Sequence, residues 1–192
     1  MTTPTFPRFA HRAALGTAVM ASLLGLGGCN DDATAFAPGC PRSDIPSEAA
    51  DYFDYSGTST DLRTLLVHAS LSGLTGDCED GPTGKGSVRS RMTVRMHVTR
   101  GPANHTGTAE IPFFVAVTHN GKIIDKKIFS QTVTFTTALS ETDVTSRVLI
   151  IDLPDAARED PDSYGMDIGF QLSPGQLTYN RAHLPAVRFK QL

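Results

Sequence analysis

The chain has 192 residues, which is enough for one ordinary domain and a leader. Hydrophobic residues make up 40% and charged residues 19%, a composition that excludes both a membrane-embedded chain and a disordered one. The formal net charge of −3 excludes a generally basic protein that coats nucleic acid. With 17 Gly, 12 Pro and no Trp, the composition is typical of many short strands joined by turns.

Residues 1–28 have the features of a secretory signal peptide. Arg8 and Arg12 precede an uncharged stretch from Ala13 to Gly28, and no acidic residue occurs before Asp31. The stretch is shorter than a transmembrane helix of about 20 residues, and its glycines weaken any helix. We therefore predict a leader that is removed on export.

The end of this leader, Leu26-Gly27-Gly28-Cys29, resembles the lipobox of bacterial lipoproteins. The resemblance implies cleavage before Cys29, acylation of its thiol and anchoring to a membrane facing the periplasm. Two or three acyl chains anchor firmly, because each buried methylene contributes about 0.8 kcal/mol. Asn30 rather than Asp follows the cysteine, which favours the outer over the inner membrane. An ordinary signal peptide followed by a chance cysteine is the alternative.

If Cys29 carries lipid, Cys40 and Cys78 remain. An even number of cysteines in an exported domain predicts a disulfide, and the two are not spaced as a CxxC redox pair. In the chain-entropy model, this disulfide stabilises the fold by roughly 4 kcal/mol. Two reduced thiols are the alternative.

Residues 29–61 are rich in Asp, Ala, Ser and Pro and lack a hydrophobic period. We interpret them as a lipidated tether and an N-terminal extension, with one or two helical turns over Pro46 to Phe53. Residues 62–192 show period two, which is typical of strands with one buried and one wet face. The clearest strand is Val88 to Thr99.

The other strands are predicted from the same alternation. Asn120-Gly121 predicts a tight hairpin turn, because both residues tolerate positive φ. We expect a bulge or a change of sheet near Ile128-Phe129. About seven strands without intervening helices predict an antiparallel β-sandwich, with a small β-barrel as the alternative. The remaining predicted strands are Leu65 to Leu74, Ile111 to Val117, Lys122 to about Phe135, a central strand at Val144 to Leu153, Tyr164 to Leu172, and a short last strand at Pro185 to Phe189.

The segment Asp162-Ser163-Tyr164-Gly165-Met166 resembles the tyrosine corner of immunoglobulin-like domains. Without Trp, and with Met166 where an antibody domain has a cysteine, the resemblance concerns the architecture only. Through Cys40-Pro41-Arg42 and the segment Gly73-Leu74-Thr75-Gly76-Asp77-Cys78, the chain also resembles an uncharacterised group of alphaproteobacterial lipoproteins. This second resemblance implies an envelope lipoprotein and supplies no activity.

The sequence lacks the familiar motifs of enzymes and metal sites. The sequence has no GxSxG and no HExxH, and Gly84-Lys85-Gly86-Ser87 lacks the spacing of a phosphate loop. The acidic run from Asp152 to Asp162 does not match a calcium loop. We therefore expect no catalytic residues, no cofactor and no metal. An envelope enzyme with an unrecognised site is the alternative function.

One surface feature points to a partner. Arg89, Arg91 and Arg95 share the polar parity of their strand with His97, so these side chains stand in a row. Guanidinium groups suit phosphate and carboxylate, so we predict binding to an anionic envelope component or an acidic protein surface. Pairing with acidic residues on neighbouring strands is the alternative. The expected function is a membrane-anchored, non-enzymatic binding or assembly module in the cell envelope, with no nucleic-acid partner.

Overall fold

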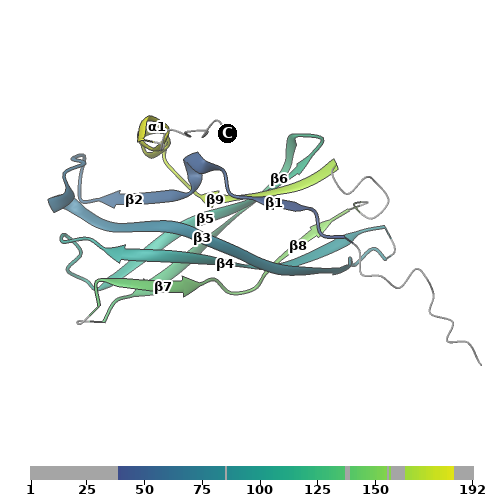
Figure 1. Ribbon diagram of the computed structural model, residues 1–192, viewed down its shortest axis with the longest axis horizontal. Coiled ribbons are helices and arrows are strands. Elements are labelled where there is room, and N and C mark those ends of the chain that lie inside the picture. The colour runs from purple at the N-terminus through teal and green to yellow at the C-terminus, as the bar shows by residue number, and fades with distance from the viewer. Residues whose placement is uncertain (1–38, 85, 137–138, 155, 157–162, 184–192) are drawn as a thin grey trace, which may run out of the picture. The chain divides into compact units, whose positions relative to one another are not determined.

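In a computed structural model, the alternating segments form the strands of two separate sheets (Figure 1). The structure describes residues 39–84, 86–136, 139–154, 156 and 163–183, which belong to one unit of the chain, Phe36–Leu192. The predicted leader, Cys29 and the strand predicted at Pro185 to Phe189 lie outside the described residues.

The sandwich prediction is confirmed, and the barrel alternative is wrong, because the sheets do not close on each other. Sheet A has the strand order β1-β9-β5-β6, and sheet B has the order β2-β3-β4-β7, with β8 also paired to β4. The strands of sheet A are β1 (Arg42–Asp44), β5 (Thr108–His119), β6 (Lys122–Thr134) and β9 (Tyr164–Phe170). The strands of sheet B are β2 (Asp51–Tyr55), β3 (Leu65–Asp80), β4 (Val88–Arg100), β7 (Glu141–Thr145) and β8 (Leu149–Leu153).

The strand pairing agrees with the immunoglobulin-like architecture in its central pairs. In such domains strand B lies beside E in one sheet and C beside F in the other. Here β4 lies beside β7 and β8, and β5 lies beside β9. The expected tyrosine corner is present, because Tyr164 begins β9 and its hydroxyl donates to the carbonyl of Pro154 at 2.8 Å. One pair departs from the antiparallel prediction, since β1 runs parallel to β9.

The core follows from the alternation. Residues of one parity on β4, β5, β8 and β9 are almost fully buried between the sheets, and their neighbours point outward. The turn at Asn120 and Gly121 has positive φ at both residues, as expected for a tight hairpin. The largest fully buried side chains include Phe113, Phe170, Met96, Ile111, Leu149 and Ile168.

Two strand predictions are corrected. The irregularity in the β5–β6 ladder lies at Val117/Thr118, because Ile128 and Phe129 pair in regular register with β5. The predicted central strand at Val144 to Leu153 is two strands, β7 and β8, both paired to the same side of β4. Between them Ser146 takes a ladder position, since its amide donates to the Val94 carbonyl at 2.9 Å.

The predicted domain boundary at residue 62 is also wrong, since β1 and β2 already belong to the sheets. In place of the one or two helical turns expected over Pro46 to Phe53, the structure has a short 3-10 helix, η1 (Ser47–Ala49). A second 3-10 helix, η2 (Leu62–Thr64), precedes β3. The helix α1 (Pro174–His183) was not expected. Its Asn180 donates to the carbonyls of Glu48 and Asp51, at 3.0 and 2.7 Å, and so holds α1 against the edge strand β2.

Candidate functional site

The predicted anchor at Cys29 lies outside the described residues, so its lipidation stays a prediction. In the part of the chain that the structure describes, no helix is long and apolar enough to cross a membrane.

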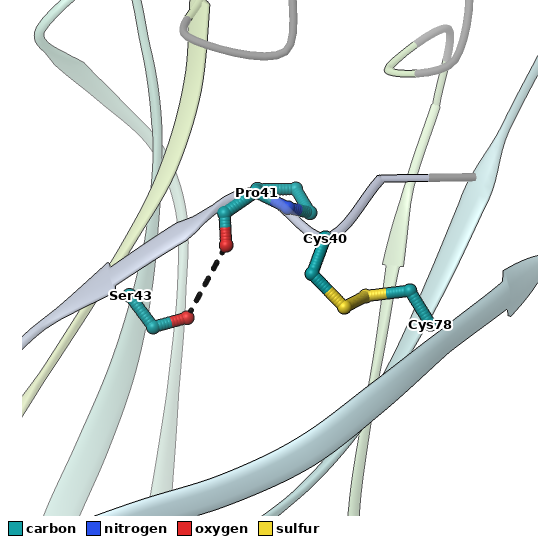
Figure 2. Close-up of a disulfide and its surroundings, with 4 residues drawn as sticks. All are labelled: Cys40, Pro41, Ser43 and Cys78. Carbon is teal, nitrogen blue, oxygen red and sulfur yellow. Dashed lines mark hydrogen bonds between the residues drawn. A yellow bond between two sulfur atoms is a disulfide. The ribbon is translucent and has the colours of Figure 1, made fainter. Parts of the chain in front are cut away.

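The predicted disulfide between Cys40 and Cys78 is present (Figure 2). The two Cα atoms are 5.4 Å apart, within the usual range for a disulfide. Cys40 lies two residues before β1 of sheet A begins, and Cys78 lies buried near the end of β3 in sheet B. The bond therefore joins an edge strand of one sheet to the other sheet and fixes the start of the domain.

The predicted row of Arg89, Arg91, Arg95 and His97 lies on the outer face of sheet B. Arg89 Nε donates to Asp152 Oδ1 at 2.7 Å, and a second bond joins Arg89 Nη2 to Oδ2 at 3.1 Å. These hydrogen bonds hold the pKa of Asp152 below its ordinary value.

The other end of the row is also paired with an acidic residue. His97 Nδ1 lies 3.0 Å from Asp143 Oδ1 on β7. Across the β3–β4 ladder, Asp77 stands opposite Arg91 and Glu79 stands opposite Arg89. Directly opposed residues on antiparallel strands share one face.

The acidic neighbours therefore reduce the positive charge that this face presents to a partner. The alternative left open by the sequence, cross-strand pairing, holds for Arg89 and His97. Arg91 and Arg95 are exposed, and neither forms an ion pair within the described residues. The predicted binding of an anionic partner stays a prediction and depends on these two residues.

A hollow of about 350 Å³ lies over the outer face of sheet A, beside η1, α1 and β6. The Nζ atom of Lys126 lies 4.1 Å from the ring centroid of Phe114. Asp167 of β9 also lines the hollow, and burial, followed by the charge of the neighbouring Asp44, raises its pKa. Apolar side chains make up much of the rest of the lining, namely Ala49, Ala116, Ile123, Leu172 and Leu177.

A second, smaller hollow of about 210 Å³ lies between α1, β2 and β3. His68 stacks on Phe53 with ring centroids 4.3 Å apart, and its Nε2 atom lies 2.9 Å from Asp51 Oδ1. From α1, Tyr179 and His183 stack on each other at 4.1 Å. No sequence pattern indicates this group, because pairing of β2 with β3 and packing of α1 bring its residues together only in the folded chain.

The surface of β6 was also not predicted from the sequence. Residues Lys122 to Ile128 are exposed on both faces of this edge strand. Their composition, three lysines and three isoleucines with one aspartate, was visible in the sequence, but the exposure of the isoleucines was not.

Within the described residues, no group of three or more His, Cys, Asp and Glu side chains is placed to hold a metal ion. Comparison of the chain with protein-family models, with curated proteins and with solved structures found no significant match.

Proposed function

We propose that the chain is a lipoprotein of the bacterial cell envelope, anchored through Cys29 to a membrane facing the periplasm. The observation that carries this proposal is the Cys40–Cys78 disulfide. Disulfides persist in oxidising compartments such as the periplasm and are rare in the cytosol. The covalent link between the sheets therefore supports export, and the lipobox-like Leu26-Gly27-Gly28-Cys29 supplies the means of attachment. The outer membrane is favoured by Asn30.

The folded domain then acts as a non-enzymatic binding or assembly module. Two exposed surfaces support this role: the central arginines of β4 and the β6 edge of sheet A. For the arginines, the proposed partner is an anionic envelope component or an acidic protein surface, because the planar guanidinium group forms paired hydrogen bonds with phosphate and carboxylate.

Substitution of Cys29 tests the anchor. The Cys29→Ala variant should accumulate as an unprocessed precursor or be released from membranes, because it lacks the thiol that receives lipid. Asn30→Ala is the matched control, since it changes the adjacent residue and keeps the thiol. Fractionation of cells and the mass of the mature N-terminus measure both effects. Fully matured, membrane-bound Cys29→Ala protein would contradict the proposal.

Crosslinking in intact cells tests the partner. The Arg91→Gln/Arg95→Gln variant should lose crosslinked products that the wild type forms, and added salt should weaken the same interaction. Arg63→Gln is a matched control, because Arg63 pairs with Asp61 on η2, away from the row. If the double variant folds and keeps every crosslink, the central arginines are a solvated face.

A second function, an envelope enzyme, is favoured by one observation, the His68–Asp51 pair in the smaller hollow. A carboxylate that orients an imidazole is a common arrangement for a general base. Ser47 lines the same hollow and carries a hydroxyl. Turnover of chromogenic esters by the wild type, lost in His68→Gln, would favour this function; equal turnover by both proteins would exclude His68 as its base.

A further inference from the structure

The β5–β6 hairpin gathers exposed apolar side chains. Ile123 is 64% exposed, Ile124 51% and Ile128 62%. These are three of the seven large exposed hydrophobic residues in the part of the chain that the structure describes, and they lie within one short segment. Apolar residues scattered singly over a surface are ordinary, but a contiguous group on an exposed strand indicates contact with something apolar.

The same segment carries a positive charge on a chain whose net charge is negative. Lys122, Lys126 and Lys127 lie among the isoleucines of this segment, and Asp125 is its acidic residue. In the described structure no carboxylate forms an ion pair with these ammonium groups, although the charge of Lys127 contributes, after Arg89, to the lowered pKa of Asp152. Asp125 instead accepts a hydrogen bond from the backbone amide of Lys126 at 2.8 Å.

The fold explains why both kinds of side chain stay exposed. The strand β6 is the edge of sheet A and pairs only with β5 in the described structure. At the irregularity, Val117 pairs with Asp125 and Thr118 pairs with Ile123, so Ile124 is the extra, unpaired residue. Ile123 and Ile128 therefore stand opposite Thr118 and Phe114 of β5 and share the outer face of sheet A.

The chemistry favours a lipid surface over a strand from another chain. Lysines and bulges on an edge strand hinder its pairing with further strands. Neighbouring lysines and isoleucines instead match a headgroup layer, where ammonium groups meet phosphates while the apolar side chains and the lysine stems enter the boundary below. An acidic protein surface would pair with the lysines but would leave the isoleucines in water.

We propose that the segment Lys122–Ile128 of the β5–β6 hairpin binds the surface of a bilayer that contains anionic phospholipid. The three lysines contact headgroup phosphates, and the three isoleucines enter the interfacial layer. The contact rests on the proposed function only in that the lipid anchor brings the domain to a membrane. Binding of the domain without its lipid can therefore fail while the anchor at Cys29 stands, and the reverse also holds.

The test uses the mature chain without its lipidated cysteine, residues 30–192, because Phe36–Leu192 contains every described strand and the core. The probes are vesicles of phosphatidylethanolamine with phosphatidylglycerol, and neutral vesicles of phosphatidylcholine. The wild type should sediment with the anionic vesicles and lose this binding at high salt. Lys126→Gln/Lys127→Gln should weaken binding about thirtyfold, at about fivefold per lysine.

Matched controls lie on the opposite sheet. Arg63→Gln removes one positive charge from η2, which precedes β3 of that sheet, and should leave vesicle binding unchanged, whereas Lys126→Gln alone should weaken it about fivefold. Ile123→Asn should weaken binding about tenfold, whereas Ile150→Asn, at a residue of β8 that is 51% exposed, should not weaken it. Circular dichroism confirms that each variant folds.

A fluorophore gives a second, independent measurement. An environment-sensitive dye on Ile123→Cys should shift to the blue with anionic vesicles, and the same dye on Ile150→Cys should not. Equal loss of binding in the lysine and arginine variants would overturn the proposal, because it would indicate unspecific attraction. Equal binding to neutral vesicles, no binding to anionic vesicles, or crosslinks from this segment to an acidic protein in place of lipid would also overturn it.

Discussion

Removal of the Cys40–Cys78 disulfide should cost the domain a large share of its stability. The bond closes a loop with a sequence separation of 38. In the chain-entropy model, a loop of this length removes about 13 cal/mol/K from the unfolded ensemble, or about 4 kcal/mol at 25 °C. For a domain of this size each kcal/mol shifts Tm by about 2–4 °C, so the Cys40→Ala/Cys78→Ala variant should melt about 8–16 °C lower.

The structure adds a reason for a loss of this size. The link holds β1, a short strand whose residues are all exposed, against β9, and it ties sheet A to sheet B. Urea unfolding followed by circular dichroism measures the free energy of unfolding. Ser43→Ala is the local control, because its hydroxyl donates only one long bond, 3.5 Å, to the Pro41 carbonyl (Figure 2), and it should change stability by less than about 0.5 kcal/mol.

Two results would refute this reasoning. One is a loss below about 1 kcal/mol in the double variant, which would show that packing alone orders the loop. The other is free alkylation of Cys40 and Cys78 in the native protein, which would also weaken the argument for export. Reduction of the wild-type protein should reproduce the variant, because both remove the same constraint.

Three further predictions concern single side chains. Tyr164→Phe should lower the free energy of unfolding by about 1 kcal/mol, as measured in urea, because the Pro154 carbonyl loses its donor. Asp167→Asn should stabilise the domain at neutral pH, because the raised pKa of Asp167 means that folding disfavours its ionised form. The gain in Tm should shrink as the pH falls to 3.8, the ordinary pKa of an aspartate, and below, where the carboxyl is protonated in the unfolded chain as well. Asn180→Ala should speed hydrogen exchange in β2 and lower the free energy of unfolding by about 2 kcal/mol, because two backbone carbonyls lose their donor. Unchanged exchange would show that α1 is held by its other contacts.

The sequence predicted a strand correctly where apolar and polar residues alternate strictly along it. The strands β4, β5 and β9 were predicted from the sequence, because their parity is strict and their buried side chains are large. In contrast, β1 is a three-residue polar strand whose place is set by pairing with β9. The helix α1 begins at Pro174-Gly175, which reads as a turn, and it is held by side-chain bonds to segments far away in the chain.

Val148 to Ile151 shows why the apolar run was misread. Four consecutive apolar residues predicted a central strand buried on both faces. In the structure Leu149 and Ile151 are buried between the sheets, but Val148 and Ile150, of the opposite parity, are 49% and 51% exposed, because only one face of β8 packs against the other sheet. Hydrophobicity along the chain does not indicate whether a second layer covers each face.

The same distinction between central and edge strands separates the two cationic surfaces. Each residue of the row on the central strand β4 has neighbours on both sides, and the neighbours of the row include Asp152, Asp143, Asp77 and Glu79. The lysines of the edge strand β6 have a neighbouring strand on one side only, and there Lys126 and Lys127 face Ala116 and Val115. The arginine row was the more conspicuous pattern in the sequence, yet its position in the sheet supplies most of its counter-charges. Local sequence can place charges on one face, but only the order of strands in the sheet determines whether that charge is available to a partner.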